Sequence, residues 1–309
     1  MATAAVIAAE HLTKSYGAQR GVIDLTFDVA PGEVFGFLGP NGAGKTTTIR
    51  TALDLLRPTD GRITLFGLDP RSDGPAIRSR IGFLPGELAL WPRMTAGDYL
   101  RAFGAFRGGV DPRSIDAYAE RLSLDLSRRI RALSHGNKQK IGLVLAFAHE
   151  PELLILDEPT QGLDPLIQQE FYSMVEEAKA RGATVFLSSH VMPEVERICD
   201  RVAIIRDGLL VRVADIADLK EQAVRMIELH FDRPVSPAAF ASLGSVRAVE
   251  PHGDALRLTV QGAADEVIKE AARHTVISVS SDEPSLEDIF LTIYRDDRED
   301  RRDGLGGDE

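Results

Sequence analysis

Short apolar runs recur along the first two thirds of the chain and predict strands. The runs are four or five residues long and show little polar alternation, as is typical of buried strands; they are residues 34–38, 81–84, 153–156, 184–187 and 202–205. Residues 22–29 instead alternate with period two, and with a strand beginning at Val6 they predict hairpin structure over residues 4–38. A helical pattern over residues 47–56 is stopped by Pro58. Strands that alternate with helices predict an α/β fold with an N-terminal antiparallel β-subdomain.

A helical insertion follows the strand at residues 81–84. Apolar side chains recur at helical spacing over residues 95–132, and Gly108-Gly109 and Asp111-Pro112 separate two helices. Because helix-spaced aromatic residues usually face a core, we expect Phe103 and Phe106 to pack inside this insertion. With its flanks it forms a helical subdomain over about residues 88–150.

The composition changes near Asp218 and predicts a second domain. The pattern there predicts strands at 225–231, 246–250, 255–260 and 275–280, with helices at 236–243, 263–273 and 285–294. This order predicts a small α+β domain, for which a ferredoxin-like split βαβ fold is one option. The last residues are charge-dense and nearly free of apolar side chains, which predicts a disordered tail. The predicted domains are therefore 1–221 and 222–295, with a tail at 296–309.

Composition narrows the classes of function. The 309 residues carry 47 acidic and 36 basic side chains, a net charge of −11, which argues against general nucleic-acid binding. The single cysteine, Cys199, excludes an intrachain disulfide. No apolar run approaches the ~18 residues that a membrane span needs, and the N-terminus lacks the basic region of a signal peptide. If the protein works at a membrane, we expect another chain to supply the membrane part.

A glycine-rich loop between the strand at 34–38 and the helix at 47–56 predicts a phosphate-binding site. It fits the pattern G-x-x-x-x-G-K-[ST] and comprises Gly39, Pro40, Asn41, Gly42, Ala43, Gly44, Lys45, Thr46 and Thr47. Glycines let the backbone curl until several N–H groups point at one anion, and the dipole of the following helix adds to the site. Lys45 can reach the β- and γ-phosphates, and the Thr46 hydroxyl can bind Mg²⁺. A chance match is improbable because both flanks are of the correct type.

Three further side chains complete a set for metal-assisted hydrolysis of a nucleoside triphosphate. Asp157 and Glu158 end an apolar strand, where α/β sheets place their ligands. Asp157 can hold Mg²⁺, and Glu158 can polarise the attacking water as a general base. His190 ends another strand and can hydrogen-bond the γ-phosphate. Each has an ordinary structural explanation when taken alone, but their order along the chain makes chance agreement improbable.

With these motifs, residues 4 to about 218 resemble the ATP-binding subunit of ABC transporters, a P-loop NTPase. In that family the loop at 39–47 is Walker A, Leu153 to Pro159 resembles Walker B with its catalytic Glu158, and His190 resembles the switch histidine. Asp164 falls in the D-loop, and Tyr16 resembles the aromatic residue that stacks on adenine. The resemblance implies ATP and Mg²⁺ as ligands and ATP hydrolysis as the activity.

The family's signature, Leu-Ser-Gly-Gly-Gln, matches residues 133–137, and the resemblance implies that Ser134, Gly136 and Asn137 contact the nucleotide held by a second copy of the chain. An ATP-bound homodimer is therefore expected. His135 replaces the first signature glycine, and Asn137 replaces the glutamine. Gly86 stands where the family usually has its Q-loop glutamine, which puts the coupling role of that loop in doubt.

The short ATPase domain and the ending Ser285-Leu-Glu-Asp-Ile-Phe-Leu291 resemble bacterial drug- and antibiotic-export ATPases of the daunorubicin-resistance type. The implied partner is a separately encoded ABC-2 type membrane permease that would hold this chain at the cytoplasmic face of the membrane. An importer ATPase and a soluble, non-transport ABC protein remain as alternatives. A regulatory pseudo-ATPase is disfavoured because Lys45, Asp157, Glu158 and His190 are all present.

The segment 86–94 is the predicted permease contact. It contains the only tryptophan, Trp91, together with Leu88 and Met94, and it precedes the first helix of the insertion. Aromatic and methionine side chains are enriched at protein interfaces. In the family this segment borders the groove that receives the permease.

Overall fold

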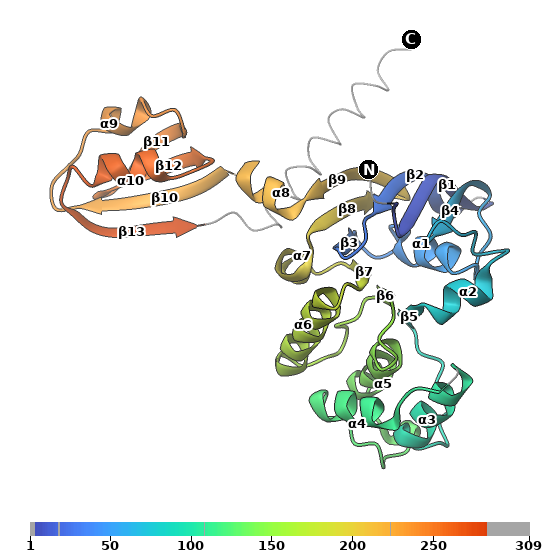
Figure 1. Cartoon of the computed structure of the whole chain (residues 1–309). Helices are drawn as coiled ribbons and strands as arrows, with labels where there is room; N and C mark the ends of the chain where they lie inside the picture. The colour runs from blue at the N-terminus through green and yellow to red at the C-terminus, as the bar shows by residue number, and fades with distance from the viewer. Residues whose placement is uncertain (1–3, 18, 108, 223, 283–309) are drawn as a thin grey trace, which may run out of the picture. The chain divides into compact units, whose positions relative to one another are not determined.

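The computed structural model describes residues 4–17, 19–107, 109–222 and 224–282. The chain divides into two compact units, Met1–Val213 and Ala214–Glu309, and each is described by itself (Figure 1). The predicted helix at 285–294 and the predicted tail lie outside the described residues. The domain limits at 221 and 295 remain predictions.

A six-stranded sheet forms the centre of the first unit. Its strands in spatial order are β5 (Ile81–Leu84), β6 (Leu153–Asp157), β7 (Thr184–Ser189), β3 (Val34–Leu38), β8 (Arg201–Arg206) and β9 (Leu209–Asp215). The pairs from β5 to β8 are parallel, and every residue of β3, β6 and β7 is buried. The uniformly apolar runs of the sequence therefore become strands covered on both faces, as predicted.

An antiparallel sheet of three strands packs beside the parallel sheet. It contains β1 (Ile7–Tyr16), β2 (Gln19–Val29) and β4 (Asp60–Leu65), in the order β2-β1-β4. Phe27 of β2 joins the two sheets, because its ring lies 5.9 Å from that of Phe35 and 6.2 Å from that of Phe186. Aromatic pairs at such distances add to the free energy of burial. The α/β fold with an N-terminal antiparallel β-subdomain is confirmed.

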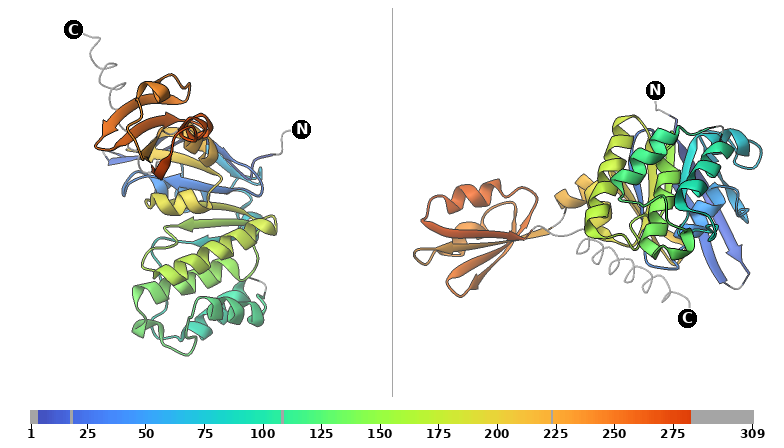
Figure 2. Two further views of the ribbon diagram at one scale, coloured as in Figure 1. Left: turned by 90° about the vertical axis from the view of Figure 1, so that its left-hand side faces the viewer. Right: turned by 90° about the horizontal axis from the view of Figure 1, so that it is seen from below.

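The helices of the first unit are α1 (Lys45–Ala52), α2 (Gly74–Ser79), α3 (Ala96–Phe106), α4 (Pro112–Arg121), α5 (His135–Phe147), α6 (Pro165–Ala180) and α7 (Met192–Ile198). In Figures 1 and 2, α3 to α5, drawn in green, gather at one end of this unit, away from the antiparallel sheet. The α1 helix ends at Ala52 rather than at the predicted residue 56, and Asp54 beyond it has a left-handed backbone, with φ 55°.

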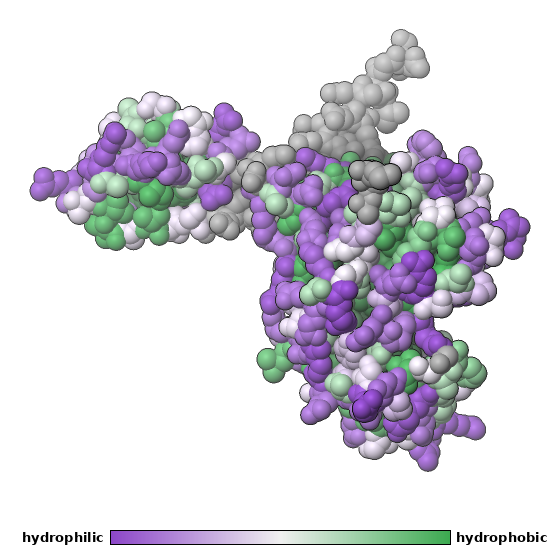
Figure 3. All heavy atoms as spheres, in the orientation of Figure 1, coloured by the Kyte–Doolittle hydropathy of each residue, from purple (hydrophilic) through white to green (hydrophobic). Residues whose placement is uncertain are grey.

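The insertion forms the two predicted helices, but its aromatic side chains differ in burial. Tyr99 is buried, and its ring lies 4.5 Å from that of Phe103. Phe106 is 80% exposed, so the prediction that it packs inside the insertion is wrong. Phe106 is the last residue of α3, and its ring meets that of Phe103 edge-on at 6.1 Å without being buried. Figure 3 accordingly shows hydrophobic surface among the mainly polar atoms of this part of the unit.

The second unit is an α+β domain of ferredoxin-like topology. It begins with α8 (Ile216–Gln222) and continues with β10 (Val224–Phe231), α9 (Ala238–Ala241), β11 (Val246–His252), β12 (Ala255–Gln261), α10 (Asp265–Ala271) and β13 (Val276–Asp282). The sheet order is β11-β12-β10-β13, and all pairs are antiparallel. Alternate residues of β10 share one core with Phe240 of α9 and Val267 of α10, so both helices cover the same face. Among the described helices of either unit, none is both long and apolar enough to cross a membrane.

Candidate active site

The loop between β3 and α1 needs glycine for two reasons. Gly42 and Gly44 have φ of 81° and 111°, a left-handed region that favours glycine. A Cβ atom on Gly39 would lie 2.4 Å from the Ile205 carbonyl oxygen, and one on Gly44 would lie 2.5 Å from Val22 Cγ1. The loop borders a pocket of about 180 Å³ lined by Gly21, Asn41, Gly42, Gly44, Lys45, Thr46, Thr47 and Glu158. The predicted phosphate loop and the predicted base thus face one cavity.

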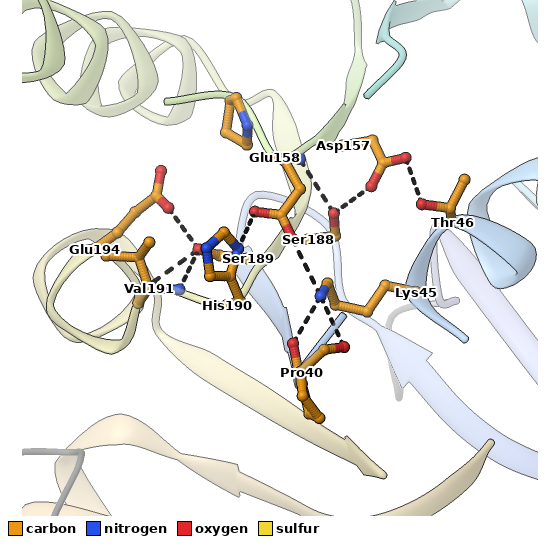
Figure 4. A network of polar contacts seen from close by, with 12 residues as sticks. Pro40, Lys45, Thr46, Asp157, Glu158, Ser188, Ser189, His190, Val191 and Glu194 are labelled. Carbon is orange, nitrogen blue, oxygen red and sulfur yellow. Dashed lines mark hydrogen bonds and ion pairs between the residues drawn. The ribbon is translucent and has the colours of Figure 1, made fainter. Parts of the chain in front are cut away.

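Lys45 holds the centre of this pocket (Figure 4). Its side chain is 6% exposed, and its Nζ donates to the Gly39 carbonyl at 2.6 Å and the Pro40 carbonyl at 3.3 Å. The same Nζ lies 3.1 Å from Glu158 Oε1. A buried ammonium group is tolerated only when oxygen atoms surround it in this way. These contacts hold the positive charge of Lys45 at the glycine-rich loop. The oxygens of a bound phosphate group could take the place of these contacts.

Asp157 is oriented by two hydroxyl groups. It is 2% exposed; Thr46 Oγ1 donates to its Oδ2 at 2.8 Å, and Ser188 Oγ donates to its Oδ1 at 2.5 Å. A carboxylate beside a hydroxyl offers the oxygen ligands that Mg²⁺ prefers, and phosphate oxygens and water usually complete such a site. The residues present therefore fit a magnesium ion. Gly86 lies alongside, since a Cβ there would be 3.1 Å from Asp157 Oδ2.

Glu158 adopts a strained backbone conformation next to Lys45. Its φ is 52°, and a left-handed residue other than glycine costs on the order of 1–3 kcal/mol, so it is kept only where surrounding contacts determine it. Its N–H donates to the carbonyl and the hydroxyl oxygen of Ser188, both at 3.2 Å. Its Oε2 lies 2.6 Å from Nδ1 of His190. The structure thereby brings Glu158, His190 and Lys45 into one connected group.

A second buried carboxyl group, that of Glu194, belongs to the helix that follows His190. Glu194 of α7 is 2% exposed, and Ser189 Oγ donates to its Oε2 at 2.6 Å. Burial raises the pKa of Glu194 to about 7, although hydrogen bonds from Ser189 and Thr160 act in the opposite direction. The sequence reasoning missed this group and Ser188. Two features of the sequence indicate these groups: a pair of serines ends an apolar strand, and a glutamate follows four positions after His190.

Several predicted site residues lie outside the pocket. Tyr16 is the last residue of β1; it is 43% exposed, and its ring borders Gly21, which does line the pocket. Ser134 caps α5 by accepting from the N–H of Asn137 at 3.3 Å. Asp164 caps α6 by accepting from the N–H of Ile167 at 3.1 Å.

The signature residues belong to the start of α5. The Asn137 amide donates to Ser134 Oγ at 3.1 Å, and Gly136 packs on the Gly162 carbonyl, where a Cβ would lie only 2.2 Å away. Neither these residues nor Asp164 lines the pocket of their own chain. Their predicted contact with nucleotide therefore depends on a second copy of the chain.

Two family models match the chain. Residues 22–161 match the family described as "ABC transporter", and residues 215–294 match "ATP-binding protein DrrA1-3-like, C-terminal domain". The two matches fall in the two compact units of the structure.

Characterised relatives match nearly the whole chain. "Bacitracin transport ATP-binding protein BcrA" of Bacillus licheniformis is 34% identical over 297 residues, which is 93% of this chain and 97% of the relative. "Linearmycin resistance ATP-binding protein LnrL" of Bacillus subtilis is 33% identical and covers 93% and 98%. "Nod factor export ATP-binding protein I" of Bradyrhizobium diazoefficiens is 34% identical and covers 91% and 93%.

A solved structure described as "Structure of ATP binding subunit of ABC transporter" is 31% identical, with a TM-score of 0.65. It covers 70% of this chain and 92% of that chain.

Proposed function

Since the chain belongs to the ATP-binding proteins of ABC transporters, we propose that it hydrolyses ATP to power export through a separate membrane permease. One observation carries the proposal: Lys45, Thr46, Asp157, Glu158 and His190 come from distant parts of the chain and are joined, through Ser188, by hydrogen bonds and ion pairs. They lie beside a pocket that Lys45, Thr46 and Glu158 line. This is the set of groups that phosphoryl transfer to water requires.

Each group has a defined part in the proposed reaction. The loop amides and Lys45 bind the phosphates, and Tyr16 stacks on the adenine. Water attacks the γ-phosphorus, the bond to the bridging β–γ oxygen breaks, and ADP and phosphate form. Glu158 accepts the proton of the attacking water, and His190 orients Glu158 and contacts the γ-phosphate. Thr46 and Asp157 would hold a magnesium ion, which neutralises phosphate charge when bound.

The active state in this proposal is a homodimer with ATP between the copies. Ser134, Gly136 and Asn137 of one copy would contact the γ-phosphate bound by the other copy, with Asp164 next to that interface. What supports this is that Ser134 is exposed and that all four residues lie outside the pocket of their own chain. A helix that begins at an exposed serine also offers free N–H groups to an anion.

The proposed permease is of the ABC-2 type, and the chain would lie at the cytoplasmic face of the membrane by binding it. Segment 86–94 is the proposed contact. Trp91 supports this because it is 53% exposed although its ring packs on Tyr99 at 6.0 Å and Phe103 at 5.7 Å. A rigidly held yet exposed aromatic ring is suited to bind a partner. The relatives are named for bacitracin, linearmycin and Nod factor, so we propose a drug, antibiotic or lipid-like cargo.

Two substitutions test the activity. Glu158→Gln should bind ATP but lose hydrolysis by ~10²–10⁴-fold, because general-base assistance is typically of that size. Lys45→Ala should lose affinity for ATP itself. Phosphate release and binding of a fluorescent ATP analogue measure the two effects.

Glu176→Gln is the matched control, because Glu176 is exposed on α6 outside the pocket. Its hydrolysis should equal that of the unmodified chain. If Glu158→Gln also hydrolysed ATP at the unmodified rate, the assignment of Glu158 as the base would be wrong.

A further inference from the structure

Gln139 is a buried polar residue of α5 whose side-chain amide binds two backbone carbonyl groups. It is 1% exposed, and its Nε2 donates to two carbonyl oxygens, those of Glu158 and Pro159, each at 3.2 Å. Two carbonyl acceptors require the nitrogen end of the amide, and they use both of its hydrogens. A side chain that only filled space at such a position would be apolar, since a buried amide is favourable only when it is hydrogen-bonded.

The carbonyl that Gln139 holds belongs to the strained residue of the site. Glu158 has a φ of 52°, and its N–H is already bound by Ser188. Gln139 binds the other side of the same residue, through its C=O, which also accepts from the N–H of Gln161 at 3.2 Å. With both backbone polar groups of Glu158 bound, its left-handed conformation is supported by contacts with β7 and α5 and by the turn that ends at Gln161.

The start of α5 also packs tightly on the loop that follows Glu158. A Cβ on Gly136 would lie 2.2 Å from the Gly162 carbonyl oxygen, and one on Gly162 would lie 2.7 Å from Cδ2 of His135. Gly136 and Gln139 are three positions apart, so they lie on the same face of the helix. The first turn of α5 and the loop 158–162 are therefore in direct contact at Gly136 and Gly162.

We propose that Gln139 is a positioning residue for ATP hydrolysis. It holds the Glu158–Pro159 backbone to α5, so the Glu158 carboxylate stays directed at Lys45 and the pocket. Ser134 and Gly136 stand at the start of the same helix. A ligand bound to those two residues is therefore connected, through α5 and Gln139, to Glu158 of the same chain. The inference rests on the proposed role of Glu158.

Two substitutions of Gln139 in the full chain test the inference. Gln139→Met keeps the length of the side chain and removes the donor, and Gln139→Glu keeps its shape while presenting an oxygen to the two carbonyls. Both should lower kcat by roughly 10- to 100-fold, since displacement of a catalytic group by about 1 Å can cost 10²-fold. The dissociation constant for a fluorescent ATP analogue should stay within about twofold, because neither variant touches the phosphate loop.

Gln168→Met is the matched control. Gln168 also donates to a backbone carbonyl, that of Leu163 directly after this loop, at 3.3 Å, but it has no hydrogen bond to Glu158. Its kcat should change by no more than roughly twofold, as for most substitutions away from a special contact. A loss as large as that of Gln139→Met would mean that general loosening of the loop explains both, and the inference would fail.

A double-mutant cycle distinguishes a positioning role of Gln139 from an effect on protein stability alone. If Gln139 acts through Glu158, then Glu158→Gln combined with Gln139→Met should hydrolyse ATP at the same slow rate as Glu158→Gln alone. Single-turnover assays with radiolabelled ATP can measure that rate. A further loss equal to that of Gln139→Met alone would overturn the inference, as would a parallel loss of ATP affinity.

The activity of Glu158→Gln also distinguishes a failure of this inference from a failure of the proposed function. If Glu158→Gln is as active as the unmodified chain, the proposed base is wrong whatever Gln139 does. If Glu158→Gln is inactive while both Gln139 variants are fully active, only the positioning role is wrong.

Discussion

Replacing Glu194 by glutamine should make the first unit more stable at neutral and alkaline pH. Burial raises the pKa of Glu194 from 4.5 to about 7, so the folded state holds this proton more tightly than the unfolded state. The carboxyl group thus stabilises the fold fully below pH 4.5, and that contribution is lost as the pH rises through 7. A shift from 4.5 to about 7 corresponds to about 3 kcal/mol, at ~1.4 kcal/mol for each pH unit.

Glu194→Gln preserves the shape of the side chain and its acceptor for Ser189 but cannot ionise. The free energy of unfolding of Glu194→Gln, relative to that of the unmodified chain, should therefore rise by roughly 2–3 kcal/mol between pH 5 and pH 8. Urea denaturation at several pH values measures this difference. The fluorescence of Trp91, the only tryptophan, follows the first unit, which also contains Glu194.

Glu176→Gln provides the control, since it makes the same glutamate-to-glutamine change at an exposed position of α6. If the advantage of Glu194→Gln were equal at pH 5 and pH 8, or larger at pH 5, the assignment of a buried protonated carboxyl group would be refuted.

Two further predictions concern partners. Glu158→Gln should form an ATP-dependent dimer, because the bound nucleotide cannot be hydrolysed; size-exclusion chromatography with and without ATP and Mg²⁺ tests this, and a monomer at micromolar concentration in both conditions would contradict it. Cysteines introduced at Leu88 and Met94 should crosslink to the co-expressed permease, and crosslinks formed only from the second unit would show that the contact lies elsewhere. Trp91→Ala should lower transport-coupled ATPase activity more than the basal activity, whereas equal losses would favour a packing role.

The sequence predicted those parts of the molecule that depend on local pattern. The strand Val34–Leu38 and the glycines after it are neighbours in the chain, so spacing alone reveals the phosphate loop. Phe106 was predicted incorrectly because helical spacing identifies a face but not whether another element covers it.

The contacts missed from the sequence join residues that are far apart in the chain. The left-handed backbone of Glu158 and the bonds to it from Gln139 follow from the packing of α5 against the strand end. Nothing in the neighbouring residues encodes them, because each partner belongs to a different element. The raised pKa of Glu194 likewise follows from its burial, which only the folded chain determines.

The contacts of Glu158 also bear on when it would be available in its proposed role as the base. One carboxylate oxygen lies 3.1 Å from the Lys45 ammonium and the other lies 2.6 Å from His190 Nδ1, so both oxygens are engaged. An oxygen paired with an ammonium group is poorly placed to accept a proton from water. A phosphate group attracts Lys45 more strongly than a single carboxylate does, because it offers more charge and more oxygens. Binding of ATP would therefore release one oxygen of Glu158, and the base would become available only when its substrate is present.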